Sequence, residues 1–186
     1  MKIAPLPGDG LRLALEIDEA AMLDQLVTQL TQLLQSYSQT ALDPDPLFAS
    51  LEVGGSEEPP EDPALARLFP DAYEEAEDAA DYRRVTEQGL VNRKLQDAMR
   101  VTSELGLGAG VPAEADFVEV EITAASLPAW ARTLTALRLA MAARIGLEAP
   151  EDHDRLLEQE STRGTVLVFD WLAAILDSVL AVTQEL

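Results

Sequence analysis

The chain has one histidine, His153, within the acidic stretch EDHDRLLEQE at residues 151–160. Imidazole and carboxylate groups together can bind a metal ion or act as a general base. Zinc and non-haem iron sites, however, usually draw on several histidine or cysteine ligands. Acidic residues in the first turn of a helix are also favoured by the helix dipole. We therefore expect the solvated start of a helix here, with no metal ion and no active site.

A second acidic stretch holds ten carboxylates between residues 57 and 81, against one arginine, Arg67. Carboxylates are so frequent that no pair stands out as an acid–base couple, and a single histidine gives no spacing for a Ser-His-Asp set. GLGAG at 106–110 follows a predicted helix, whereas a phosphate-binding loop follows a strand and opens a helix. It predicts a helix stop and a turn. We predict no enzymatic activity and no cofactor.

The composition narrows the classes of partner. The 186 residues carry a net charge of −21, which repels nucleic-acid phosphates and anionic lipid and suits a basic protein surface. The absence of cysteine excludes disulfides and thiol chemistry. The N-terminus lacks the apolar region of a signal peptide, and Asp170 and Asp177 interrupt the apolar run at 166–182. We expect a cytoplasmic protein.

The hydrophobic pattern predicts a mainly helical α+β fold, in which four to five helices pack on a small antiparallel sheet within a single domain, 1–186. The last helix is apolar nearly all round, which predicts the centre of the core or a dimer seam. Its exception is a thin stripe of Asp170, Ala174, Asp177 and Ala181. The predicted order is a hairpin (2–16), a helix capped by Asp18 (to 38), an acidic Pro/Gly-rich mobile loop (40–62), a short helix (63–69), a long helix (72–105), a strand (117–122), a helix capped by Ser126 (to 145), a short helix (150–160) and the last helix (163–184).

Three helices have apolar stripes that predict which face is buried. On the long helix, Arg84 and Glu87 interrupt the stripe. Either this half of the helix projects into water with a solvated ion pair, or the pair is partly buried and orients the helix. Arg144, near the apolar line of its own helix, is a candidate counter-charge for this interrupted part of the long helix. The alternative is a last-turn arginine whose head group reaches water. The stripes are Leu23, Leu26, Leu30, Leu33 and Tyr37; Tyr73, Ala76, Ala80, Val91, Leu95, Ala98, Thr102 and Leu105; and Trp130, Leu134, Leu137, Met141 and Ile145.

Basic residues on the long helix do not form one face. Arg83, Arg84, Arg93, Lys94 and Arg100 scatter around the axis, with acids interleaved. Direct DNA binding is therefore weakly supported. The spacing predicts i,i+4 ion pairs instead. The predicted pairs are Arg83–Glu87, Arg93–Asp97 and Arg100–Glu104.

Four segments in the same order and spacing resemble one known family over residues 11–182. They are DPALARLFPDAY (62–73), DYRRVTEQGL (81–90), the pattern W-x3-L-x2-LR from Trp130 to Arg138, and FDWL (169–172). The family is that of the actinobacterial oxidative stress transcriptional regulator, AosR, formerly listed as a domain of unknown function. None of the four motifs is catalytic.

The resemblance implies a non-enzymatic regulator of transcription linked to stress sigma factors of the extracytoplasmic-function type. Without cysteine, disulfide sensing cannot operate in this chain. We predict contact with such a sigma factor or with RNA polymerase, no membrane partner, and a homodimer as an open possibility. The alternatives are an adaptor of Clp proteolysis, suggested by the family's gene neighbourhood, and a direct DNA-binding regulator. The predicted contact residues are Asp71, Tyr73, Glu74, Glu75, Asp78, Asp81, Arg83, Arg84 and Glu87.

Overall fold

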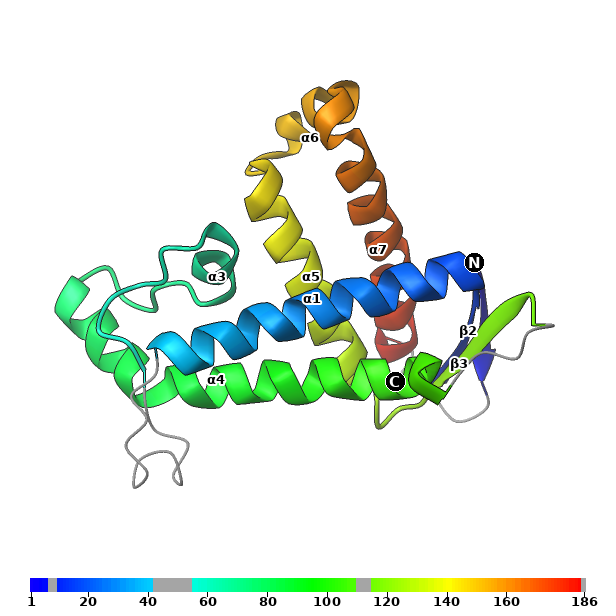
Figure 1. Ribbon diagram of the computed structural model, residues 1–186, viewed down its shortest axis with the longest axis horizontal. Coiled ribbons are helices and arrows are strands. Elements are labelled where there is room, and N and C mark those ends of the chain that lie inside the picture. The colour runs from blue at the N-terminus through cyan, green and yellow to red at the C-terminus, as the bar shows by residue number, and fades with distance from the viewer. Residues whose placement is uncertain (7–9, 42–54, 110–114, 185–186) are drawn as a thin grey trace. The chain divides into compact units, whose positions relative to one another are not determined.

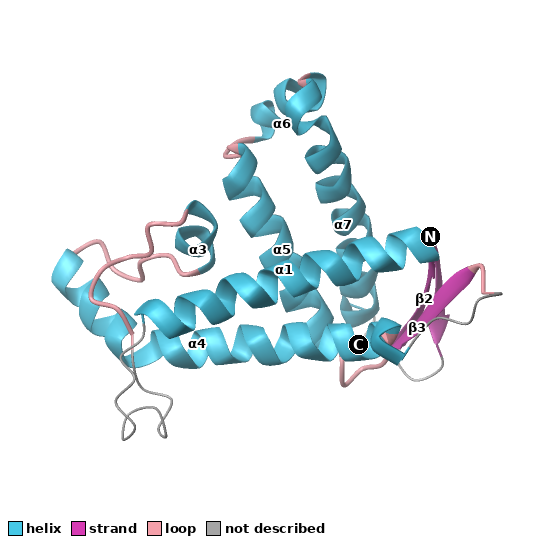
Figure 2. Cartoon of the chain, in the orientation of Figure 1, coloured by secondary structure: helices cyan, strands magenta, loops and turns pink. Residues whose placement is uncertain are grey.

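A computed structural model describes residues 1–6, 10–41, 55–109 and 115–184 of the chain (Figure 1). These residues form six α-helices and one three-stranded antiparallel sheet, so the predicted mainly helical α+β class is confirmed (Figure 2). The helix count exceeds the predicted four to five.

Contacts along the chain divide it into two compact units. Unit 1 comprises Met1–Thr31, Gln96–Arg138 and Leu167–Leu186, and unit 2 comprises Gln32–Leu95 and Leu139–Val166. The single domain expected from the sequence stays a prediction. Four helices contribute residues to both units: α1 (Ile17–Ala41), α4 (Ala76–Leu105), α5 (Leu127–Ile145) and α7 (Glu160–Gln184).

The sheet of unit 1 confirms the predicted hairpin and the later strand. Strand β1 (Lys2–Leu6) pairs with β2 (Gly10–Glu16), and β2 pairs with β3 (Phe117–Ile122), both antiparallel. Side chains alternate along β2, so that Leu11, Leu13 and Leu15 are buried. On the other face, Arg12 lies opposite Glu121 and donates a hydrogen bond of 2.7 Å to it. Residues 7–9, between the two strands of this hairpin, lie outside the described residues.

Unit 1 also contains two polar contacts between α4 and α5. Asp97 is 8% exposed and accepts two hydrogen bonds from Arg132, at 2.6 and 2.8 Å. Glu104 accepts a 2.7 Å hydrogen bond from the indole of the buried Trp130. These contacts fasten the last turns of α4 to the first turns of α5.

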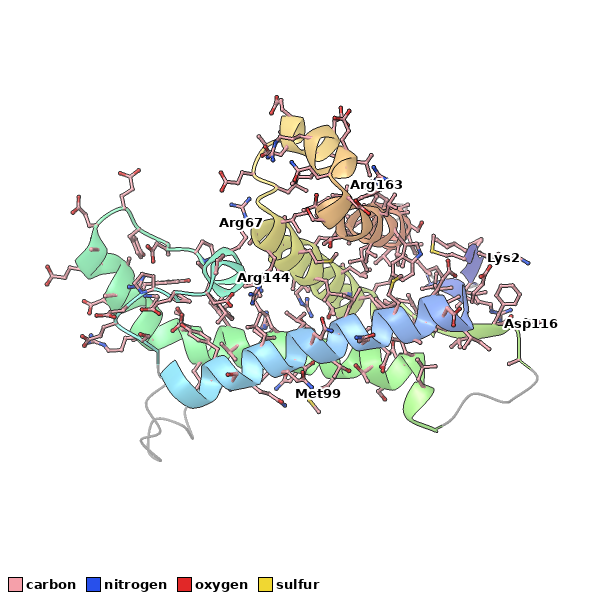
Figure 3. The ribbon with its side chains drawn as sticks, turned by 45° about the horizontal axis from the view of Figure 1, so that its top comes forward. Lys2, Arg67, Met99, Asp116, Arg144 and Arg163 are labelled. Atoms are coloured by element: carbon pink, nitrogen blue, oxygen red, sulfur yellow. The ribbon has the colours of Figure 1, made fainter. Side chains whose placement is uncertain are left out.

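Unit 2 contains two short helices, α3 (Pro63–Leu68) and α6 (Pro150–Glu158), which confirm the predicted short helices. Asp62 caps α3 by accepting hydrogen bonds from the backbone N–H groups of Ala64 and Leu65. Its other carboxylate oxygen lies 2.7 Å from Arg144, which Figure 3 labels. Arg144 is therefore a counter-charge, as one of the two alternatives predicted, but its partner is the cap residue Asp62 and its side chain is also 55% exposed.

Helix ends follow the glycines but not all of the predicted caps. Gly106 and Gly146 adopt φ of 69°, which stops α4 and α5 as predicted. Asp18 does not cap α1, because the helix already begins at Ile17. Ser126 directly precedes α5, but its hydroxyl exchanges hydrogen bonds with the backbone of Thr123.

Several predicted boundaries were wrong by a few residues. Helix α4 begins at Ala76, four residues later than predicted, and α7 begins at Glu160, three residues earlier. Helix α1 extends to Ala41, so the predicted loop at 40–62 begins later. Of that loop, residues 42–54 lie outside the described part of the chain, and residues 55–62 are irregular.

Helix α1 buries most of the predicted stripe, whereas α7 buries less than expected. In α1, Leu23, Leu30 and Tyr37 are buried as predicted, but Leu26 and Leu33 are only half-buried and Val27 and Leu34 are buried in their place. In α7, the acidic stripe is exposed as predicted. Leu167 and Leu180 are exposed as well, at 55% and 40%. Helix α7 thus contributes one side to the core, with Leu172, Ile175 and Val179 buried, and is not surrounded by it; the alternative of a dimer seam stays a prediction.

Candidate functional site

The first half of α4 buries two charged side chains along its packing line. Ala79, Arg83, Glu87 and Val91 follow one another at four-residue spacing and are all buried. Arg83 is 7% exposed and Glu87 is 1% exposed. A buried charge is costly unless it is paired or hydrogen-bonded, so the partners of these two residues define the local structure.

Glu87 is held by two neutral donors from distant parts of unit 2. The hydroxyl of Tyr37, on α1, donates a 2.7 Å hydrogen bond to Oε1, and the backbone N–H of Ser56 donates a 3.0 Å bond to Oε2. Burial, together with this hydrogen bond and the negative charge of Glu87, raises the pKa of Tyr37. The hydroxyl of Tyr37 therefore keeps its proton and donates a hydrogen bond to the carboxylate of Glu87.

Arg83 is held by one carboxylate and one carbonyl. Its guanidinium forms an ion pair with Asp71 and donates a 2.6 Å hydrogen bond to the carbonyl oxygen of Glu57. Arg83 and Glu87 thus both bind the segment of residues 55–57, which we call the strap. Gly55 begins the strap and packs directly on the backbone of Arg83, where an added Cβ would collide with the carbonyl oxygen.

A pocket of about 260 Å³ lies beside this pair, within unit 2. Phe69, one of its walls, stacks on Tyr37 with ring centroids 5.7 Å apart. The ammonium of Lys94 lies 5.6 Å from the centre of the same ring. The residues that line the pocket are Leu68, Phe69, Pro70, Asp71, Ala72, Tyr82, Arg83, Thr86, Glu87 and Leu90.

Three of the nine predicted contact residues come together at this pocket: Asp71, Arg83 and Glu87. Tyr73 is 53% exposed, and its ring packs edge-on against Tyr82 with centroids 5.7 Å apart. The remaining predicted residues are exposed and lie outside the pocket lining. They are Glu74, Glu75, Asp78, Asp81 and Arg84.

The predicted ion pairs were right in one case of three. Arg100 pairs with Glu104 at 3.1 Å, as predicted. Asp97 pairs with Arg132 in place of Arg93, and Glu87 bonds to Tyr37 and Ser56 in place of Arg83.

The choice of buried arginine was also wrong. Arg84 is exposed and pairs with Asp81 at 2.9 Å, whereas Arg83 is the arginine on the buried line. Both readings left open concerned Arg84 and Glu87, and neither describes them: Arg84 is exposed, whereas Glu87 is buried and bonds to Tyr37 and Ser56.

Sequence reasoning missed Ser56, Tyr82 and the polar role of Tyr37. Tyr37 is buried, as its place on an apolar stripe predicts, but its hydroxyl also donates a hydrogen bond to Glu87, which the stripe does not indicate. The spacing of Arg83, Glu87 and Val91 was a usable signal for the buried line. No periodicity marks Ser56, because it lies in an irregular segment.

The acidic stretch around His153 forms a helix start, as predicted. Asp152 accepts hydrogen bonds from the backbone N–H groups of Glu148 and Ala149. Its contact with Arg155 and these two bonds lower the pKa of Asp152 to about 2. Within residues 1–6, 10–41, 55–109 and 115–184, no group of three or more His, Cys, Asp or Glu side chains could hold a metal ion.

One helical segment of the described chain, Glu160–Val182, is long and apolar enough to cross a membrane by length and composition alone. It has 23 residues, and an 18-residue window within it has a mean hydropathy of 2.0. A core helix of a globular protein meets the same criteria, so the localisation of the chain stays a prediction.

Comparison with known sequences gives a family but no activity. The sequence profile of one family, described as "Domain of unknown function (DUF2017)", matches residues 3–183, which is nearly the whole chain. The search of curated proteins and the search of solved structures found no match. The extent of the match makes the conclusion plain: the chain belongs to the DUF2017 family.

Proposed function

We propose that the protein is a non-enzymatic, cytoplasmic regulator of transcription in the oxidative stress response. It acts by binding a stress sigma factor of the extracytoplasmic-function type or RNA polymerase. The finer identification as a member of the AosR regulators is part of this proposal. It rests on the resemblance of residues 62–73, 81–90, 130–138 and 169–172.

The observation that carries the proposal is the exposure of the acidic stretch at 57–81. Of its ten carboxylates, all except Asp62 are exposed. Only Asp71 and Asp81 among those nine form ion pairs within the described residues, with Arg83 and Arg84. The other seven lack such pairs, which favours a basic protein partner, because complementary charge accelerates and orients association.

The charge of the whole chain supports a protein partner over nucleic acid. A net charge of −21 opposes the phosphate backbone, on which DNA affinity largely depends. Sigma factors and polymerase bind promoter DNA, which requires basic surfaces. Such a surface is a suitable counterpart for the exposed carboxylates.

The test is a calorimetric titration of the protein with purified stress sigma factors and RNA polymerase of the host, at low and high salt. We expect saturable binding that weakens as salt rises, because exposed charges are screened. Absence of binding, combined with tight binding to promoter DNA, would overturn the proposal.

A matched pair of charge variants tests whether binding depends on one acidic surface or only on the net charge of the protein. The test variant is Glu74→Gln, Glu75→Gln, Asp78→Asn and Asp81→Asn. The control is Glu148→Gln, Glu151→Gln, Asp154→Asn and Glu158→Gln, which neutralises the same number of exposed acids elsewhere. We expect the test variant to bind at least about tenfold more weakly, and the control to change binding by less than about threefold.

A further inference from the structure

The pocket beside Arg83 and Glu87 is large enough for one apolar side chain. Its volume is about 260 Å³, whereas a protein cavity of about 150 Å³ holds a benzene molecule. Leu68, Phe69, Tyr82 and Leu90 supply apolar walls. The carboxylate of Glu87 is already hydrogen-bonded to Tyr37 and Ser56, so an entering apolar group leaves those bonds in place.

The rim of this pocket is exposed and aromatic. Tyr82 and Leu90, which line it, are 41% and 44% exposed. Tyr73, 53% exposed, packs against Tyr82 and extends the apolar surface. Exposed tyrosine and leucine side chains next to a concavity are typical of protein-binding surfaces, where aromatic residues supply much of the contact area.

The charge around the pocket specifies the occupant further. Residues 57–90 contain eleven carboxylates and three arginines. Two of these arginines are already paired, Arg83 with Asp71 and Arg84 with Asp81. An acidic peptide, nucleic acid or anionic lipid would be repelled from this surface, whereas lysine and arginine flanking an apolar residue would be attracted.

We propose that this pocket accepts a single phenylalanine- or leucine-sized side chain from a basic segment of a partner protein. The inference deepens the proposed function and rests on it for the identity of the partner. The pocket supplies the anchor site, and the surrounding carboxylates select the basic flanks.

The test uses three short fluorescent synthetic peptides and measures binding by anisotropy. The first contains lysine, arginine and alanine with one central phenylalanine. The second replaces that phenylalanine with alanine, and the third keeps it but replaces every lysine and arginine with glutamate. We expect the first peptide to bind at least about tenfold more tightly than the second, because burial of a phenyl ring is lost. The third should not bind.

Two variants on α4 locate the binding. Leu90→Gln changes a pocket wall, and Val85→Gln changes a residue of similar exposure, 52% against 44%, outside the lining. Neither variant alters charge. We expect Leu90→Gln to reduce the preference for phenylalanine over alanine at least about fivefold, and Val85→Gln to retain it.

Equal binding of the phenylalanine and alanine peptides to the unmodified protein would overturn the proposal that the pocket accepts an apolar side chain. An equal effect of Leu90→Gln and Val85→Gln on the preference for phenylalanine would also overturn it. Binding of the glutamate peptide would overturn the basic specificity. These outcomes are separable from the proposed function. If the peptides bind but sigma factors and polymerase do not, the proposed function is refuted and the pocket proposal stands. If sigma factors or polymerase bind but the peptides do not, only the pocket proposal is refuted.

Discussion

Glu87 and Asp97 are both buried carboxylates on α4, but they are held in different ways. Asp97, in unit 1, is 8% exposed and receives both hydrogen bonds from one guanidinium, that of Arg132. Glu87, in unit 2, is 1% exposed and receives its bonds from neutral donors, a tyrosine hydroxyl and a backbone N–H.

The difference lies in what each carboxylate organises. Asp97 and Arg132 form an ion pair between two regular helices, and the arginine side chain is 51% exposed to water. Glu87 joins α4 to α1 and, together with Arg83, to the irregular strap, which is not part of a helix or sheet. The ion pair of Asp97 and Arg132 joins two helices that are already hydrogen-bonded internally. Glu87 instead holds the strap, which has no backbone hydrogen-bond ladder of its own.

The largest effect is expected from Glu87→Ala. Removal of the carboxylate leaves the hydroxyl of Tyr37 and the N–H of Ser56 without their acceptor, and creates space in the core. We expect a loss of about 3–4 kcal/mol in the free energy of unfolding, measured by urea denaturation. Gln96→Ala, at an exposed position of α4, is the control and should change stability by less than about 0.5 kcal/mol.

A smaller loss is expected from Asp97→Ala. Its partner Arg132 is half-exposed and can be solvated when the carboxylate is gone. We expect the free energy of unfolding to fall by about 2 kcal/mol in the same measurement. A loss equal to that of Glu87→Ala would show that the type of partner does not matter, and would remove the distinction between the two sites.

Tyr37→Phe tests the neutral donor directly. The change removes one hydrogen bond to a buried carboxylate and keeps the ring that stacks on Phe69. We expect a loss of about 1.5 kcal/mol near neutral pH.

The raised pKa of Tyr37 gives this variant a pH signature as well. The unfolded tyrosine loses its proton near pH 10, whereas the folded one retains it. The stabilisation is thus complete below about pH 10 and declines as pH rises above it, by up to ~1.4 kcal/mol per pH unit. Urea titrations across this range should show the advantage over Tyr37→Phe shrinking, and a constant advantage would contradict the assignment.

The smallest effect is expected at a half-buried carboxylate, Asp152. Its pKa is lowered to about 2 by Arg155 and by the backbone N–H groups of Ala149 and Glu148. The stabilisation is therefore present above about pH 4 and lost as pH falls through about 2. Asp152→Asn should lower the melting temperature slightly at neutral pH, and this difference should narrow in acid. Asp154→Asn, at a side chain 94% exposed, should have no such effect.

The fold was predictable wherever a local pattern determines it. Alternation of Leu11, Leu13 and Leu15 marks the central strand, and Gly106 and Gly146 end their helices because they adopt positive φ. The site was predictable only in part. Arg83 and Arg84 are adjacent, and the choice between them depends on Asp71 and the Glu57 carbonyl, which lie in segments without periodicity. The four-residue spacing of Arg83, Glu87 and Val91 favours Arg83 for the buried line, but a helical pattern cannot indicate where its partners will lie.

The N–H of Ser56 gives the strap a measurable property of its own. Amides in irregular segments usually exchange their hydrogen with solvent quickly, but this one is bonded to the buried carboxylate of Glu87. The amide of Ser56 should therefore exchange its hydrogen much more slowly than that of Glu58, whose N–H donates an exposed hydrogen bond to Ser56 Oγ. A nuclear magnetic resonance exchange experiment would then follow opening of the strap through a single slow amide.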